Sequence, residues 1–171
     1  IQFVERTLIK NTRQKSSNKP IVVITGAGGN IGTALTKKLK ANYQVVGMDL
    51  KPDKCDIVAD LTSADSLRLA FNQLHREHGD KIAAVIHLAA YFDFTGVKSV
   101  LYEEVNVEGT RHLLDALEPF DVERFIYSGT MLVHKPVSPG EYVTESSPLA
   151  PGWAYPESKA ETEEVIQQYG E

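Results

Sequence analysis

The 171-residue sequence contains a single cysteine, Cys55, so it cannot form an intrachain disulfide and has no cysteine cluster for a metal. It also lacks long apolar runs, since its longest aliphatic stretches are only as long as a strand. Its N-terminal residues do not include the apolar core of a signal peptide. The net charge is −5, and no basic face of the kind that binds nucleic acid is evident. We therefore expect a cytoplasmic protein without a bound metal that binds neither nucleic acid nor a membrane.

The overall composition is that of a globular chain. Hydrophobic residues make up 42% and charged residues 24% of the sequence, and the length suits one domain with a sizeable core. Residues 10–19 form a basic polar run that is rich in lysine, serine and asparagine. We interpret residues 1–19 as a solvated N-terminal extension and residues 20–171 as the folded domain.

The most informative stretch begins with four consecutive aliphatic residues, 21–24, which predict a strand buried on both faces. The strand leads into a turn with Gly26, Gly29 and Gly32, and a helix is expected from about Asn30. Such a turn lets the backbone approach a pyrophosphate, while the helix N-terminus offers unpaired N–H groups. Three spaced glycines alone are a weak signal. With a strand before them, a helix after them and an acid downstream, they predict a dinucleotide site.

The downstream acid is Asp49, which ends a second predicted strand over residues 44–48. It lies 23 residues beyond Gly26, close to the spacing expected for the acid that accepts the adenosine ribose hydroxyls. A carboxylate there repels a 2′-phosphate and so favours NAD over NADP, although Lys51 weakens that exclusion. A solvated aspartate at a strand end is the alternative, which the glycine turn disfavours.

The rest of the chain alternates between strands and helices, which predicts an α/β fold with a doubly wound parallel sheet, the Rossmann fold. Further strands are expected at residues 56–59, 81–90 and 123–128, and further helices at 62–79, 99–118 and 160–169. His87, inside an apolar strand, is interpreted as a structural histidine. Asn106 is an unusual choice for a helix interior and is expected to hold a water or a backbone carbonyl near the cofactor.

Three residues form the candidate catalytic set. Tyr155 and Lys159 are four positions apart and share one helical face. A lysine ammonium beside a phenol is expected to lower the pKa of the phenol, which makes the tyrosine an acid–base at neutral pH. Thr130 follows the last predicted strand on the cofactor side. A surface tyrosine–lysine pair is the alternative, and the order of motifs along the chain favours the catalytic interpretation.

Several motifs together resemble the extended short-chain dehydrogenase/reductase superfamily, in its NAD-dependent epimerase/dehydratase branch, which includes UDP-glucose 4-epimerases. The resemblance covers about residues 20–170. The motifs in chain order are residues 25–32 (TGAGGNIG), Asp49, Asp60-Leu61, residues 87–90 (HLAA), residues 106–110 (NVEGT), residues 127–130 (YSGT), Glu145-x-x-Pro148-x-x-Pro151 and residues 155–159 (YPESK).

The resemblance implies a role for each matching position. The residues implied to bind the pyrophosphate are Gly26, Gly29, Asn30, Ile31 and Gly32. Asp49 is implied to hold the adenosine ribose, and Asp60 and Leu61 to contact adenine. Leu88, Ala89 and Ala90 are implied to flank the cofactor, with Asn106 nearby. Lys159 is implied to bind the nicotinamide ribose and tune Tyr155, the acid–base, while Thr130 binds the substrate hydroxyl.

Two departures from the family pattern stand out, because Gly129 replaces a common serine and His134 a common tyrosine. Family members also run to about twice this length. The resemblance thus implies that this chain lacks the last strand and the C-terminal substrate lobe. Family members often dimerise through the helices that carry Asn106 and Tyr155, so a homodimer is expected.

The expected function is that of an NAD-dependent epimerase or dehydratase acting on a secondary alcohol of a small molecule, a nucleotide sugar in the leading hypothesis. One alternative is a net NAD(P)-dependent alcohol oxidoreductase, similar to hydroxysteroid dehydrogenases or flavonol reductases. The other is a non-catalytic NAD-sensing module, against which the presence of Thr130, Tyr155 and Lys159 argues.

Overall fold

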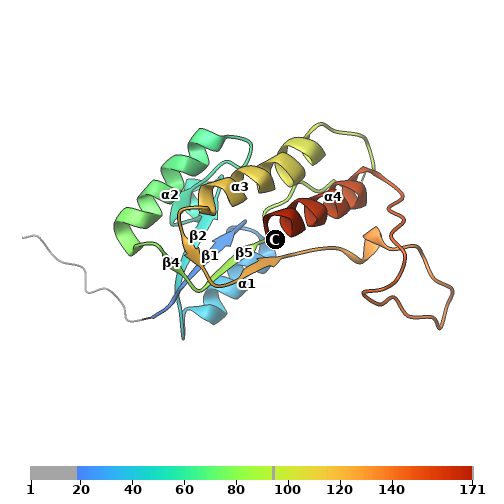
Figure 1. Ribbon diagram of the computed structural model, residues 1–171, viewed down its shortest axis with the longest axis horizontal. Coiled ribbons are helices and arrows are strands. Elements are labelled where there is room, and N and C mark those ends of the chain that lie inside the picture. Colours follow the sequence, from blue (N-terminus) through green and yellow to red (C-terminus); the bar gives the residue numbers. More distant parts are fainter. Residues whose placement is uncertain (1–18, 94, 171) are drawn as a thin grey trace, which may run out of the picture.

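A parallel sheet lies between helices in the computed structural model, which describes residues 19–93 and 95–170 (Figure 1). The strands are β1 Ile21–Thr25, β2 Gln44–Asp49, β3 Ile57–Val58, β4 Lys81–Ile82, β5 Ala84–His87, β6 Asp121–Val122 and β7 Phe125–Tyr127. The helices are α1 Asn30–Leu39, α2 Ala64–His78, α3 Gly109–Leu117 and α4 Ala154–Tyr169. Shorter helical segments are η1 Pro52–Lys54, η2 Tyr102–Glu108, which is a π-helix, and η3 Met131–Val133.

The main sheet has the order β3-β2-β1-β5-β7, and every neighbouring pair is parallel. The chain moves outward from β1 to β3 and then crosses back to β5 on the other side of β1. This reversal creates a crevice at the carboxyl ends of the central strands, where open α/β sheets bind their ligands. The predicted doubly wound parallel sheet is confirmed.

Both faces of the sheet are covered, as the continuous aliphatic run in β1 requires. Val23 packs on one face in a buried cluster with Leu67 of α2 and Leu113 of α3. Ile24 points to the opposite face and packs with Leu35 of α1. Successive residues of β1 therefore pack against the helices on opposite faces of the sheet. This packing holds β1, and with it the turn that follows, between the two helical layers.

Two predicted strands differ from the structure. Residues 81–90 contain two shorter strands, β4 and β5, whereas residues 123–128 contain only β7, and β6 lies just before that range. β4 and β6 pair with each other in a separate two-stranded sheet. The pairing of Val22 with Ala84 sets a register that places Ile82 level with Pro20, just before β1 begins. Since proline has no backbone N–H, it cannot continue the ladder there.

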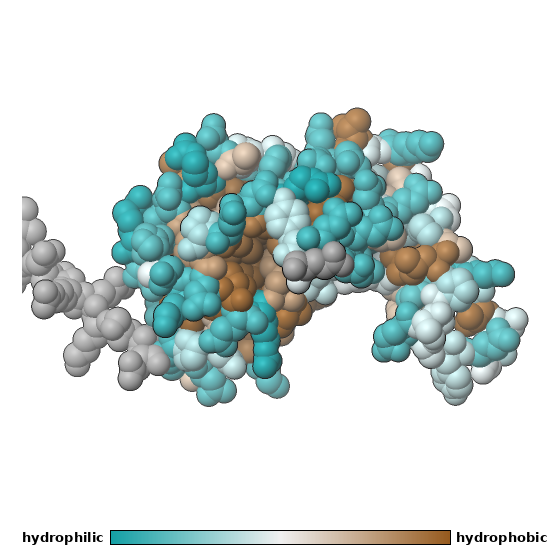
Figure 2. All heavy atoms as spheres, viewed as in Figure 1, coloured by the Kyte–Doolittle hydropathy of each residue, from teal (hydrophilic) through white to brown (hydrophobic). Residues whose placement is uncertain are grey.

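Helix α4 begins at Ala154, earlier than the predicted start at residue 160. It packs against η2 and α3 (Figure 1). The segment between β7 and α4 extends away from the sheet, and Figure 2 shows both polar and apolar side chains on it. The expected extension, apart from Lys19, lies outside the described residues. Over the part of the chain that the structure describes, no helix is long and apolar enough to cross a membrane.

Candidate cofactor-binding and catalytic site

The turn after β1 is built from glycines because other residues do not fit. Gly26 has a φ of +69°, and a Cβ there would lie 2.8 Å from the backbone nitrogen of Ala89. A Cβ on Gly32 would lie 2.3 Å from the carbonyl oxygen of Gly26. The start of α1 is thus pressed directly onto the turn, and the turn onto the end of β5.

The N-terminus of α1 faces this turn with free backbone donors. Its N-cap is Gly29, which has no side chain to cap the helix. The first helical hydrogen bond runs from the N–H of Thr33 to the carbonyl of Gly29 (2.9 Å), so the N–H groups of residues 30–32 precede it. The side chain of Ile31 in this first turn is 63% exposed, which is unusual for a large aliphatic residue. The arrangement suits an anion with an apolar neighbour.

Asp49 lies at the carboxyl end of β2, beside the glycine turn. Its Oδ2 accepts the N–H of Gly28 (3.0 Å), and its Oδ1 accepts the N–H of Lys51 (3.3 Å). The carboxylate therefore also holds the glycine turn in place, a structural role that spacing alone did not reveal. Asp49 remains partly exposed and retains lone pairs for a ligand.

A cleft of about 300 Å³ opens at the carboxyl ends of β1, β2 and β5. Eight of the predicted cofactor-binding residues line it: Gly26, Gly29, Asp49, Asp60, Leu61, Leu88, Ala89 and Ala90. Lining residues that were not predicted are Thr25, Met48, Leu50, Ala59, Thr62 and Val105. The first five are sequence neighbours of predicted residues at strand ends, whereas Val105 comes from η2 and has no local signal.

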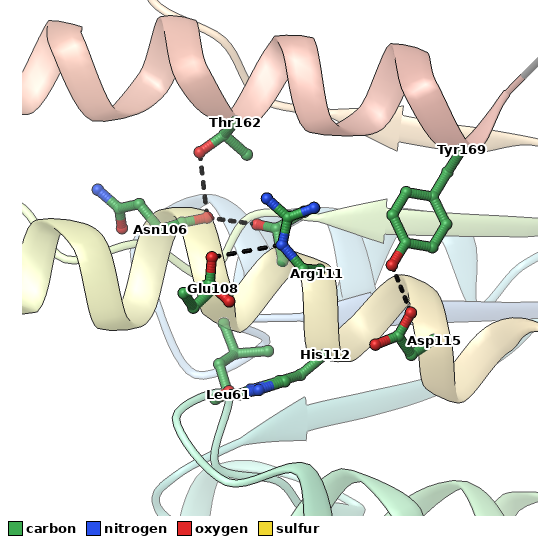
Figure 3. A network of polar contacts seen from close by, with 9 residues as sticks. Leu61, Asn106, Glu108, Arg111, His112, Asp115, Thr162 and Tyr169 are labelled. Atoms are coloured by element: carbon green, nitrogen blue, oxygen red, sulfur yellow. Dashed lines mark hydrogen bonds and ion pairs between the residues drawn. The ribbon is translucent and has the colours of Figure 1, made fainter.

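Asp60 and Leu61 form the rim of the cleft after β3. Oδ1 of Asp60 accepts the N–H and the hydroxyl of Thr62 at 2.9 and 2.8 Å, which closes a tight turn. Leu61 is buried, and a Cβ on Gly109 would lie 2.8 Å from its Cβ. Close packing at Gly109 therefore brings α3 against the cleft rim, where His112 also contacts the carbonyl of Leu61 (Figure 3).

Asn106 is buried and ties three segments together. Its Oδ1 accepts the N–H of Tyr91 (2.7 Å), and its Nδ2 donates to the carbonyl of Tyr91 (3.1 Å) and to Oγ of Ser158 (2.9 Å). Its backbone carbonyl accepts the hydroxyls of Thr110 and Thr162, the latter reaching across from α4 (Figure 3). The amide thus holds a backbone carbonyl, as expected, and connects the loop after β5 to α4.

His87 is a structural histidine, as the sequence predicted. Nδ1 lies 2.6 Å from the hydroxyl oxygen of Thr25, and Nε2 lies 2.9 Å from that of Thr110. Burial, together with the charge of Lys159, lowers the pKa of His87 to about 3. The ring is therefore neutral at physiological pH.

Tyr155 and Lys159 both lie in α4, one turn apart. Lys159 is only 1% exposed, and its Nζ lies 4.1 Å from the centroid of the Tyr127 ring. Burial lowers the pKa of Lys159 to about 8, against the opposing effect of Glu163. Within the described residues no hydrogen-bond acceptor contacts Nζ of Lys159. The ammonium is held by the face of an aromatic ring.

The expected lowering of the Tyr155 pKa is wrong for this structure. Burial raises the pKa of Tyr155, and Tyr102 raises it further. The phenol lies among aromatic rings: the Phe92 centroid is 4.5 Å away at an interplanar angle of 62°, and the Trp153 centroid is 5.6 Å away. Since desolvation disfavours the phenolate, Tyr155 holds its proton at neutral pH.

Thr130 is not brought into contact with the other two candidate catalytic residues. It caps η3, where its hydroxyl accepts the N–H of Leu132 (3.3 Å). Between Thr130 and either Tyr155 or Lys159, the described part of the chain shows no hydrogen bond. Nor do three histidine, cysteine, aspartate or glutamate side chains of that part lie close enough to hold a metal ion.

Comparison with known proteins places this architecture in a family. Residues 22–171 match the sequence profile of the NAD dependent epimerase/dehydratase family, so the chain belongs to this family. The predicted resemblance is confirmed.

Among its relatives are two enzymes of nucleotide-sugar chemistry. The chain is 32% identical over 174 residues to a dTDP-D-glucose 4,6-dehydratase of Dictyostelium discoideum, covering 86% of this chain and 40% of that protein. It is 29% identical over 163 residues to a UDP-glucose 4-epimerase of Oryza sativa subsp. japonica, covering 85% of this chain and 40% of that protein. The crystal structure of UDP-glucose 4-epimerase from Thermus thermophilus in complex with NAD superposes with a TM-score of 0.76 at 27% identity, covering 88% of this chain and 50% of that one. The chain thus spans half or less of the length of these relatives.

Proposed function

We propose that this chain is the NAD-binding part of an epimerase or dehydratase that acts on a secondary alcohol of a nucleotide sugar. The observation that carries the proposal is the glycine turn of β1, which directs the N-terminus of α1 into a cleft beside the Asp49 carboxylate. The relatives named above, which act on dTDP-glucose and UDP-glucose, support the substrate class.

The residues present fit NAD. A methyl group on Gly26 or Gly32 would strike backbone atoms, so the cradle for a pyrophosphate exists only with these glycines. The N–H groups of residues 30–32 are available to a phosphate, and Asp49 to ribose hydroxyls. Lys159 supplies a buried ammonium whose hydrogen-bond donors have no acceptor among the described residues, as a site for a ribose requires. When bound, NAD supplies the hydride acceptor.

In this proposal, Asp49 selects NAD. Its carboxylate is fixed by the N–H groups of Gly28 and Lys51, so it cannot turn away from a ligand without breaking those hydrogen bonds. A phosphate beside a fixed carboxylate is repelled, and this disfavours the 2′-phosphate of NADP.

Tyr155 is the proposed acid–base. Its raised pKa keeps the phenol protonated in the free protein, the form that donates to a substrate oxygen. To accept the substrate proton it must first lose its own, against burial and Tyr102, which both raise its pKa. Thr130, on the segment after β7, is the proposed partner of the substrate hydroxyl. Its hydroxyl oxygen accepts the N–H of Leu132, which leaves its own proton and a second lone pair for the substrate hydroxyl.

The first test is isothermal titration calorimetry of the chain with NAD and NADP. We expect NAD to bind and NADP to bind far more weakly. Asp49→Ala should weaken NAD binding by about tenfold or more, because it removes the ribose acceptor and frees the Gly28 N–H. Asp49→Asn removes the negative charge and keeps one acceptor oxygen, which can serve Gly28, while its NH2 group replaces the oxygen that accepts the Lys51 N–H. It should narrow the difference in affinity between NAD and NADP.

Asp53→Ala is the matched control, since Asp53 is an exposed aspartate of the neighbouring η1 that lies outside the cleft. It should leave both affinities unchanged. If neither cofactor binds to the wild type, or if Asp49→Ala binds NAD as tightly as the wild type, the proposed cofactor site is wrong.

A further inference from the structure

Gly129, directly after β7, makes room for a carboxylate from α4. A Cβ at this position would lie 2.6 Å from Oε1 of Glu163. Atoms do not approach so closely, so any other residue at position 129 must push the carboxylate aside. The clash involves the flexible end of a side chain and not backbone, so the fold itself tolerates a methyl group there.

Glu163 lies one helical turn beyond Lys159, on the same face of α4. Its side chain is half-buried between α4 and the end of β7. The ion pairs found among the described residues involve other groups, so Glu163 acts on Lys159 through space and not by direct contact. Its negative charge raises the pKa of Lys159, against the lowering caused by burial.

The other groups around Lys159 do not carry a compensating charge. His87 from β5 is neutral at physiological pH. Tyr127 from β7 presents its ring to Nζ, and burial raises the pKa of its phenol well above the usual range. Tyr155, on α4 itself, is also protonated at neutral pH. The Glu163 carboxylate is therefore the negative charge that acts on this buried ammonium.

We propose that Glu163 is a positioning residue that keeps Lys159 protonated, and that Gly129 exists in this chain to admit its carboxylate. The consequence for cofactor binding rests on the proposed function, in which a charged Lys159 binds the nicotinamide ribose. The electrostatic part stands on the geometry of the free protein alone.

The decisive experiment is a pH titration of the lysine Cε resonances in cofactor-free protein labelled with ¹³C-lysine. The Lys159 resonance is assigned by its disappearance in Lys159→Arg. We expect Glu163→Gln and Gly129→Ala each to shift the Lys159 titration to lower pH. Because both act on one carboxylate, the double variant should shift it no further than Glu163→Gln alone.

Glu164→Gln is the matched control, since it removes the same charge from the next residue of α4, which is exposed. It should leave the Lys159 titration in place. Glu163→Asp keeps the charge on a shorter side chain, so its Lys159 titration should move to lower pH by less than that of Glu163→Gln. If Glu163→Gln titrates like the wild type, or if Glu164→Gln shifts Lys159 equally, the inference is overturned.

A second readout separates this inference from the proposed function. The NAD affinity of Glu163→Gln should match that of the wild type at about pH 6, where Lys159 is charged in both, and fall several-fold below it near pH 8. A loss that is equal at all pH values would indicate a purely structural role and overturn the inference. If the titration shifts but the wild type binds no NAD, the electrostatic inference stands and the proposed function fails.

Discussion

Lys159 is a cation buried in the interior of the free protein, and replacing it with an uncharged side chain of similar length should stabilise the fold. The side chain is 1% exposed, and its pKa falls from the ordinary 10.5 to about 8. Each pKa unit corresponds to about 1.4 kcal/mol, so keeping the lysine protonated in the fold costs about 3 kcal/mol. Lys159→Met retains the aliphatic packing and removes this cost.

The pH dependence of this gain follows from proton binding. Below about pH 8 the lysine is charged in both native and unfolded chains, and the full cost is present. Between pH 8 and 10.5 the unfolded chain binds more protons than the native one, so the stability of the wild type rises with pH. The advantage of Lys159→Met should therefore be about 3 kcal/mol at about pH 7, shrink as the pH rises from about 8 and approach zero only above pH 10.5.

Urea denaturation followed by circular dichroism at several pH values measures this difference. Lys38→Met, on the exposed face of α1, is the control and should change stability little at any pH. The same Lys159→Met variant should bind NAD more weakly, because the proposed ribose ligand is lost, although the fold becomes more stable. If Lys159→Met is less stable than the wild type at neutral pH, with a difference that does not vary with pH, the reasoning about the buried charge is refuted.

Three further changes test the scaffold of the site. His87→Gln should make the stability of the fold fall less steeply as the pH drops below 6.5. In the wild type the histidine stays neutral in the fold, with a pKa of about 3, while the unfolded chain takes up a proton, and this uptake favours unfolding. Urea denaturation across this pH range measures the difference. Gly32→Ala should destabilise the fold by roughly 1–3 kcal/mol and abolish NAD binding, since its Cβ would lie 2.3 Å from the Gly26 carbonyl; thermal denaturation and calorimetry report the two effects. Tyr127→Phe should leave stability unchanged or raise it by up to about 1 kcal/mol, because the phenol oxygen is buried without a hydrogen-bond partner among the described residues; thermal denaturation again measures it.

Two of these changes have a control variant in the same chain. Gly152→Ala places a methyl group where nothing lies within 4 Å and should be silent, whereas Gly32→Ala should not. Tyr169→Phe removes a hydroxyl that donates to Asp115 and should lose a little stability, the opposite of Tyr127→Phe. A His87→Gln variant whose acid unfolding runs parallel to that of the wild type would contradict the assignment of the low pKa.

The sequence was sufficient to predict the parts of the site that depend on neighbouring residues. The aliphatic run of β1, the glycine turn and the acid after β2 are local patterns, and the parallel topology follows once strands and helices alternate. Eight of the predicted cofactor residues therefore line one cleft. The early start of α4 was also readable, since Pro156 falls in its first turn, where a missing N–H costs nothing.

What could not be predicted depends on tertiary contacts. The spacing of Tyr155 and Lys159 says that they share a face, but not that Nζ of Lys159 lies on the ring of Tyr127, more than 30 residues earlier. Burial among aromatic rings reverses the expected direction of the Tyr155 pKa, and no local pattern reports burial. Val105 joins the cleft only because η2 passes over the sheet.

The choice of asparagine at position 106 becomes understandable when the two halves of the site are considered together. Its amide binds both backbone polar groups of Tyr91, which directly follows the cleft residue Ala90, and the hydroxyl of Ser158, which directly precedes Lys159. An apolar residue would leave the partly buried N–H and carbonyl of Tyr91 without this partner, at a cost of about 1–3 kcal/mol for each group, whereas the Ser158 hydroxyl would keep its bond to the carbonyl of Tyr155. The residue thus links the rim of the cofactor cleft to the helix that carries the proposed acid–base. Because the Asn106 side chain is buried and bonds to both segments, a shift of either the loop after β5 or α4 would break hydrogen bonds to the other, so the fold couples the position of the cleft to that of the proposed acid–base.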